Sequence, residues 1–192
     1  KKGVSKKEPL FSTITVVYNG EEFLEKTIAS VVNQSCKNFE YIIIDGGSTD
    51  KSLDIINKYE KKIDYWVSEK DNGIYDAFNK GMIISKGEFI GFINSDDIYK
   101  KNALNIISNY IEKNKVADFI FGSVKKHWGI LHGYKPHKIK YSWGFYSSHS
   151  TGFFIKRKVA EKIGFYNIKY KYHADYDYFY RLIVKNKMKG IS

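Results

Sequence analysis

The sequence predicts an α/β fold in one domain, with a mostly parallel sheet that carries helices on both faces. Short apolar runs rich in β-branched residues alternate with longer segments in which apolar residues recur every three or four positions. Such alternation implies right-handed crossovers and therefore parallel strands. A second observation is length: 192 residues with 43% hydrophobic content suffice for one complete core and are too few for two.

The first elements set the pattern for the rest. Residues 11–18 alternate in polarity and are rich in Thr, Val and Ile, which predicts a strand. Residues 21–34 place apolar side chains on one helical face, with Glu21 and Glu22 in the first turn, where the helix dipole favours acidic groups. The same alternation then predicts strands at 39–44, 63–67 and 88–93, and helices at about 49–59, 74–85 and 102–112.

The regular alternation ends after a strand expected at 117–122. Residues 123–149 combine aromatic, histidine and glycine residues without a clear period, so we expect a loop or short hairpin that lies over the pocket and sets specificity. A strand at 152–156 and helices at about 159–163 and 174–185 follow. Residues 1–9 are basic and end in a proline, which is typical of a flexible leader, and the domain is expected over 10–192.

The composition narrows the class of protein. A single cysteine, Cys36, excludes an internal disulfide framework and fits a reducing compartment. No apolar run approaches the roughly 20 residues that span a bilayer, and no signal-peptide core follows the lysines at the start. We therefore expect a soluble, cytoplasmic protein. The missing initiator methionine and the way the chain stops within a new segment indicate a fragment that is truncated at its C-terminus.

The formal net charge of +11 is the strongest compositional bias. It predicts an anionic partner, which could be a nucleotide diphosphate, an acidic lipid surface or a nucleic acid. Charge alone does not choose among the three. Peripheral contact with the inner face of a membrane is therefore one expectation that the charge leaves open.

Polar clusters at the ends of predicted strands indicate the site. They are Tyr18-Asn19, Asp45-Gly46-Gly47-Ser48, Ser68-Glu69-Lys70-Asp71 and Asn94-Ser95-Asp96-Asp97. The carboxyl ends of parallel strands meet at one edge of the sheet, so we expect these clusters to converge on one pocket. Asp96 and Asp97 could hold Mg²⁺ or Mn²⁺ with open positions for phosphate oxygens, or could form a turn that caps the next helix; their place after a buried strand favours the metal.

Asp45 follows the most continuous apolar strand and precedes two glycines, which would let the backbone approach a flat ligand. Its carboxylate could accept a hydrogen bond from a base N–H, or could serve only as a turn residue before Ser48. Tyr18 could stack on a base, or could be the last aromatic residue of its strand.

Two further segments carry candidate side chains. Asp76, Asn79 and Lys80 share one face of a predicted helix, and the flanking Gly73 and Gly81 indicate close packing of that face. Asp175 and Asp177 open the last helix, where a carboxylate is either a cap or, if it faces the pocket, a general base.

Taken together, these motifs resemble the family 2 glycosyltransferases of the nucleotide-sugar type, which have the Rossmann-like GT-A fold. The resemblance covers nearly the whole chain. It rests on Thr15-Val16-Val17-Tyr18-Asn19, Ile43 to Asp50, Gly73 to Gly81, Asn94-Ser95-Asp96-Asp97, and Ala174-Asp175-Tyr176-Asp177 followed by Arg181-Leu182. It implies a nucleotide-binding part at about 10–100 and an acceptor-side part at about 115–192. Asn94 and Ala174 depart from the family pattern, which often has Asp and Glu at these positions.

The resemblance also implies roles for individual residues. Tyr18 and Asp45 would hold the base, usually uracil; Asp96 would contact the ribose or the metal, and Asp97 the metal. Asp175 takes the place of the catalytic base. The full nucleotide-sugar set is Val16, Tyr18, Asp45, Asp71, Asp76, Lys80 and Asp96. Candidates for contact with the acceptor or the diphosphate are Trp143, His149, His173 and Asp177.

The implied reaction is a direct displacement that inverts the anomeric carbon, with the metal neutralising charge on the departing diphosphate and Asp175 taking the proton of the acceptor hydroxyl. The acceptor would be a glycan, a lipid-linked or a protein-linked hydroxyl, as in polysaccharide biosynthesis, and no nucleic acid is expected. His149 could reach the diphosphate or the acceptor, or could be a buried structural histidine. His127, His132 and His137 match no common zinc spacing.

Two alternatives remain open. One is a module that binds nucleic acid or an acidic surface, supported by the charge and by 17% aromatic residues. The other is a nucleotidyltransferase, although the glycine-rich basic loop that such enzymes carry after the first strand is absent. A dinucleotide-dependent dehydrogenase is excluded because Tyr18-Asn19-Gly20-Glu21 lacks the glycine fingerprint.

Overall fold

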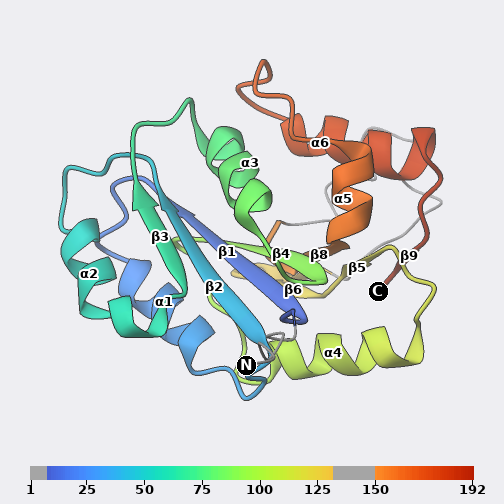
Figure 1. Ribbon diagram of the computed structural model, residues 1–192, viewed down its shortest axis with the longest axis horizontal. Coiled ribbons are helices and arrows are strands. Elements are labelled where there is room, and N and C mark those ends of the chain that lie inside the picture. Colours follow the sequence, from blue (N-terminus) through green and yellow to red (C-terminus); the bar gives the residue numbers. More distant parts are fainter. Residues whose placement is uncertain (1–7, 132–149) are drawn as a thin grey trace, which may run out of the picture.

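A computed structural model describes residues 8–131 and 150–192, and its centre is one seven-stranded sheet (Figure 1). The strand order is β3-β2-β1-β4-β8-β5-β9, and a separate hairpin pairs β6 with β7. The strands are β1 (Phe11–Val17), β2 (Phe39–Asp45), β3 (Tyr65–Ser68), β4 (Phe89–Asn94), β5 (Phe119–Phe121), β6 (Val124–Lys126), β7 (Gly129–Leu131), β8 (Phe153–Lys156) and β9 (Gly190–Ile191).

The parallel half of the sheet is built around β1. Every residue of β1 is buried, because β2 pairs with one side of it, β4 with the other, and helices cover both faces. The register is regular, so that Ile14 lies opposite Ile42 and Phe92. Alternate side chains of these strands enter the two hydrophobic layers, as the period of two in a strand requires.

Helices lie on both faces of the sheet (Figure 1). One face carries α1 (Leu24–Val32), α2 (Ser52–Lys58) and α4 (Ala103–Lys113), which bury Leu24, Ile56 and Leu104. The other face carries α3 (Ile74–Ile84), α5 (Arg157–Ile163) and α6 (Ala174–Phe179), which bury aromatic and aliphatic side chains of one cluster. The predicted α/β class, with a mostly parallel sheet and helices on both faces, is therefore confirmed.

The second half of the sheet differs from a simple repeat of strand and helix. β8 runs antiparallel to both of its neighbours, β4 and β5. β9, which pairs with β5, contains only two residues and was not predicted. The predicted single helix over 174–185 is divided, since α6 continues into a π-helical segment, Tyr180–Lys185.

Part of the region expected to be irregular is regular. The β6–β7 hairpin occupies its first residues, as the alternative of a short hairpin allowed. Glu8, the last charged residue of the predicted leader, forms an ion pair with Arg157 at 3.2 Å, and Pro9 accepts a backbone hydrogen bond from Glu88. Within the described residues, no helix has both the length and the apolar character needed to cross a membrane.

Candidate functional site

The end of β2 is organised by the carboxylate of Asp45, which is completely buried. It accepts hydrogen bonds from the backbone N–H groups of Gly47 (3.0 Å) and Ser48 (2.9 Å) and from the hydroxyl groups of Ser48 (2.5 Å) and Ser68 (2.6 Å). Asp45 therefore shapes the turn after β2, the alternative that the sequence left open. Its contact with a base remains a prediction.

Tyr18 follows β1 and is 65% exposed, so that its ring is open to stacking. The loop that carries it is held against the turn after β2 by the backbone and the side chain of Asn19. The Asn19 N–H donates to the Ser48 hydroxyl (2.8 Å), and the Asn19 side chain accepts from the Thr49 N–H (2.8 Å). Asn19 itself has a φ of 50°, in the left-handed region. Val16, by contrast, is buried within β1.

The loop between β3 and α3 is ordered by its own carboxylates. Asp71 accepts from the Gly73 N–H (2.8 Å), and Asp76 accepts from the Asn72 N–H (3.0 Å). A Cβ added to Gly46 would lie 2.5 Å from the Asp71 carboxylate, so this loop rests directly against the turn after β2. Asp45 and Asp71 are thereby brought to adjacent loops.

The polar side chains of α3 make different kinds of contact. Lys80 pairs with Glu69 at 2.8 Å, and the hydrogen bond to Glu69 raises the pKa of the lysine. Asn79 accepts from the Tyr166 N–H and donates to the Tyr166 carbonyl. The expectation of close packing holds at Gly81, where an added Cβ would lie 2.6 Å from Ile14. It is wrong at Gly73, which has open space around it and a φ of 105° that only glycine adopts freely.

The cluster after β4 presents oxygen atoms. Asp96 is exposed, whereas Asp97 is half-buried and accepts hydrogen bonds from Asn94 (3.2 Å) and from Thr151. The side-chain amide oxygen of Asn94 is buried and has no hydrogen-bond partner within the described residues.

The oxygen atoms of the cluster after β4 suit a hard divalent cation, but they supply only some of the ligands that it needs. The residues that the structure describes contain no group of three or more His, Cys, Asp or Glu side chains that could hold a metal by themselves. Two carboxylates and the unpaired Asn94 oxygen are hard ligands, and Mg²⁺ or Mn²⁺ at a diphosphate site takes its remaining ligands from phosphate and water. The residues therefore fit a cation that is shared with a bound diphosphate.

Asp175 is exposed at the first turn of α6. The hydroxyl of Tyr75, on α3, donates a hydrogen bond to it at 3.2 Å. Burial, and secondly the charge of Asp175, raise the pKa of Tyr75, so the phenol stays protonated as a donor. The Tyr75 ring also stacks on Tyr166 with centroids 5.6 Å apart. These contacts join α3 to α6 beside the candidate base.

The other candidates near α6 have different surroundings. His173 is exposed and has a left-handed φ of 65° at the start of the helix. Asp177 accepts from Arg181 at 2.8 Å, and Arg181 also donates to the carbonyl groups of Ile163 and Phe165. Asp177 thus anchors α6 to the loop after α5. Trp143 and His149 lie outside the described residues.

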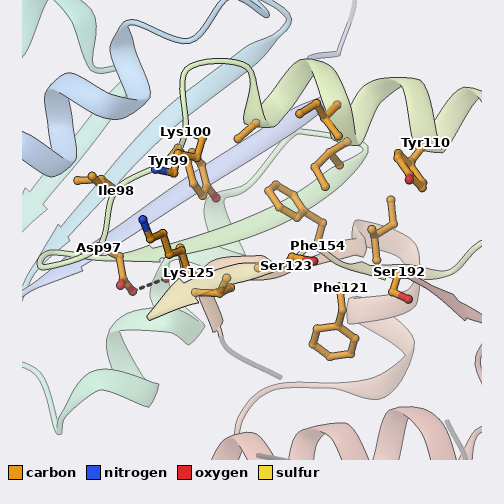
Figure 2. A pocket seen from close by; sticks show the side chains of 18 of the residues that line it. Asp97, Ile98, Tyr99, Lys100, Tyr110, Phe121, Ser123, Lys125, Phe154 and Ser192 are labelled. Carbon is orange, nitrogen blue, oxygen red and sulfur yellow. Dashed lines mark hydrogen bonds between the residues drawn. The ribbon is translucent and has the colours of Figure 1, made fainter. Parts of the chain in front are cut away.

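The strand ends gather at one edge, as predicted, because Val17 of β1 lies opposite Asp45 and Val16 lies opposite Asn94. A single shared cavity is not what the described residues form. Asp96 and Asp97 line a cavity of about 540 Å³ between α4 and β5 (Figure 2), and neither Asp45 nor Asp175 lines it. The Asp45 carboxylate instead points into the turn that follows β2.

Two contacts of the candidate residues were missed from the sequence. Thr151 donates to Asp97, and Tyr75 donates to Asp175. Both pairs join residues far apart in the chain, so no local pattern could indicate them.

This arrangement, a mostly parallel sheet with carboxylates gathered at the carboxyl edge and an antiparallel strand beside them, defines an α/β domain with the GT-A fold. The family model "Glycosyl transferase family 2" matches residues 12–176. The chain belongs to this family.

Relatives by sequence carry related descriptions. A PGL/p-HBAD biosynthesis glycosyltransferase of Mycobacterium tuberculosis is 29% identical over 179 residues, which cover 88% of this chain and 68% of the relative. An uncharacterized glycosyltransferase of Methanocaldococcus jannaschii is 30% identical over 193 residues, which cover 93% of this chain and 66% of that protein.

Similar folds occur among solved structures. S. aureus TarS matches with a TM-score of 0.78 and 22% identity over 95% of this chain and 35% of its own. The mannosyltransferase PcManGT of Pyrobaculum calidifontis, solved with GDP-Man and Mn²⁺, matches with a TM-score of 0.73 and 15% identity over 97% of this chain and 55% of its own. The present chain thus spans about a third to a half of these structures.

Proposed function

We propose that this chain forms the donor-binding and catalytic part of an inverting glycosyltransferase that moves a sugar from a nucleotide-diphosphate sugar, a UDP-sugar by preference, to an acceptor hydroxyl. The observation that carries the proposal is the strand register. It places Asp45 and the Asn94–Asp97 cluster on either side of the end of β1, in a chain of this family. A TarS structure with UDP-GlcNAc supports the choice of donor by analogy of fold.

The donor would lie across the ends of β1, β2 and β4. The exposed ring of Tyr18 would stack on the base, and the Asp45 turn would border its edge. Asp71, Asp76 and Lys80 would line the sugar and diphosphate side, since their loop rests against Gly46.

A divalent cation would be held by Asp96 and Asp97, with the unpaired oxygen of Asn94 as a further ligand. When bound, the cation supplies positive charge for the diphosphate as it departs. Thr151 fixes the carboxylate of Asp97 by a hydrogen bond, which keeps the ligand oriented.

Asp175 would accept the proton of the acceptor hydroxyl. The hydrogen bond from Tyr75 orients one of its oxygen atoms, and its exposure leaves the other oxygen accessible to an acceptor. We also propose His173, His149 and Trp143 as acceptor or diphosphate contacts; Asp177 is a weaker candidate because Arg181 engages its carboxylate.

The test combines thermal shift and turnover. UDP with Mn²⁺ is expected to raise the melting temperature of the wild-type chain more than either alone, because the cation and the diphosphate share a site. Asp175→Asn should keep this shift and lose about two to four powers of ten in turnover. Asp97→Asn should lose the additional shift given by Mn²⁺.

Asp54→Asn is the matched control and should behave as the wild type, because Asp54 is an exposed residue of α2 that does not line the cavity at Asp96 and Asp97. No stabilisation by any nucleotide diphosphate with Mn²⁺ would refute the proposal. So would near-normal turnover in Asp175→Asn.

A further inference from the structure

The cavity beside Asp96 and Asp97 has two chemically different ends. Its volume of about 540 Å³ is in the range of small-molecule sites. In Figure 2, Asp97, Lys100 and Lys125 lie toward one end, whereas Tyr110 and Phe121 lie toward the other. Lys100 precedes α4 and Tyr110 lies about two helical turns into it, so the ends are on the order of 10 Å apart.

The apolar end is unusual because two of its large side chains are left open to solvent. Ile106 and Tyr110 are 53% and 44% exposed, and both line this cavity. Buried side chains of the sheet, Ile120 and Phe154, form its floor. An exposed apolar surface that is gathered in one concavity indicates a ligand with an apolar body.

The charged end carries two lysines without acidic partners. Among the described residues, neither Lys100 nor Lys125 forms an ion pair with a carboxylate. Both are exposed and both line the cavity. Two ammonium groups at the mouth of an apolar cavity complement a phosphate that is attached to an apolar chain.

We propose that this cavity binds the acceptor, and that the acceptor is a lipid-linked phosphate. The apolar chain lies against Ile106, Tyr110 and Phe154, and Lys100 and Lys125 hold the phosphate. The sugar or hydroxyl beyond the phosphate then extends toward Asp96 and Asp97, at the same end of the cavity. This assignment rests on the proposed function, in which a cation balances the charge of the two carboxylates.

The binding test uses farnesyl phosphate as the probe, with farnesol and inorganic phosphate as partial probes, titrated by calorimetry in the presence of Mn²⁺. Farnesyl phosphate should bind, farnesol should bind at least about tenfold more weakly, and inorganic phosphate should not bind measurably, because each end of the ligand contributes separately. Equal affinity for farnesol and farnesyl phosphate would overturn the proposal, and so would no binding of either.

Matched variants locate the site. The double change Lys100→Gln with Lys125→Gln should weaken farnesyl phosphate by about tenfold or more and leave farnesol unchanged. The control pair, Lys101→Gln with Lys113→Gln, alters exposed lysines that do not line the cavity and should have no effect. An equal loss in the control pair would show nonspecific attraction and overturn the proposal.

The apolar end is tested by Ile106→Glu, which should abolish binding of both farnesyl probes. Ile83→Glu is its control, because Ile83 is 65% exposed on α3, away from the cavity. Equal effects of the two changes would overturn the proposal.

A donor thermal shift on the same preparations separates the two proposals. A shift with UDP and Mn²⁺ but no binding of farnesyl phosphate overturns the acceptor assignment and leaves the transferase intact. Farnesyl phosphate binding without any donor response overturns the transferase, and the acceptor role with it.

Discussion

Residues at the candidate site mainly hold one another in position through hydrogen bonds. Asp45 illustrates the point, because its two oxygen atoms accept four hydrogen bonds from Gly47, Ser48 and Ser68. A buried carboxylate is tolerated only with such compensation. Removal of the carboxylate would release the turn after β2 and the loop that rests on it.

Tyr75 allows a sharper prediction at this scale. Tyr75→Phe removes the hydrogen bond to Asp175 and keeps the ring stacked on Tyr166. We expect kcat to fall roughly tenfold, since a hydrogen bond to a charged group is lost, while donor affinity and melting temperature stay close to wild type. Steady-state kinetics with separate determination of kcat and KM measures this.

Tyr172→Phe is the matched control, because Tyr172 is 70% exposed in the loop before α6. A loss of donor affinity in Tyr75→Phe, or unchanged kcat, would contradict a positioning role for Tyr75.

Among the elements, α3 connects the carboxyl edge of the sheet to α6. It starts at Gly73, where the backbone needs a positive φ, and its middle lies close to β1 at Gly81. The close approach of helix and strand leaves no room for a side chain at Gly81. This packing sets where the loop at Asp71 and the hydroxyl of Tyr75 lie.

Gly81→Ala tests this packing. Alanine favours a helix more than glycine, yet the added methyl group would overlap the Ile14 side chain. We expect a net loss of about 1–3 kcal/mol in the free energy of unfolding, measured by urea denaturation. Ile83→Ala in the same helix should cost much less, because Ile83 is exposed. Stabilisation by Gly81→Ala would show that the helix can move away from β1.

The sequence predicted the secondary-structure elements better than their tertiary contacts. β2 and β4 were recognisable because each contains a continuous apolar run, and β1 because it alternates in polarity and is rich in β-branched residues. β9 was missed because a two-residue strand has no period of its own and exists only through pairing with β5. The antiparallel direction of β8 is likewise a tertiary property that a linear pattern does not carry.

At the candidate site, too, sequence patterns locate some features and tertiary contacts alone set the others. Positions at strand ends, such as Asp45 and Asp97, could be found from the sequence because each follows a buried strand. The direction of each side chain could not, since the partners of Asp97 and Asp175 come from Thr151 and Tyr75.

The core of the molecule contains several buried tyrosines, and their burial makes the free energy of unfolding fall at alkaline pH. Burial raises the pKa of Tyr41, Tyr99, Tyr166 and Tyr178 in the folded chain. In the unfolded chain these groups titrate near about 10. The unfolded state therefore releases protons first, so stability is fully present below about pH 10 and is lost as the pH rises above it.

Urea denaturation between about pH 8 and about pH 11 should show this loss, and two variants serve as internal controls. The Tyr178 hydroxyl is buried without a hydrogen-bond partner in the described part of the chain, whereas the Tyr41 hydroxyl pairs with Thr15 at 2.9 Å. Tyr178→Phe should keep or raise stability at neutral pH, and Tyr41→Phe should lower it by about 1 kcal/mol. Both should flatten the alkaline decline; an unchanged decline in both would refute the role of these phenols.

The position of β8 has one last consequence. Because this strand is inserted between β4 and β5, the backbone of Gly91 meets the Phe154 ring so closely that an added Cβ would lie 2.4 Å from it. The N-terminal and C-terminal parts of the chain thus form one continuous sheet instead of two hinged lobes. Changes in the outer loops of the C-terminal part can therefore leave β4, and the Asp96–Asp97 cluster that follows it, in place.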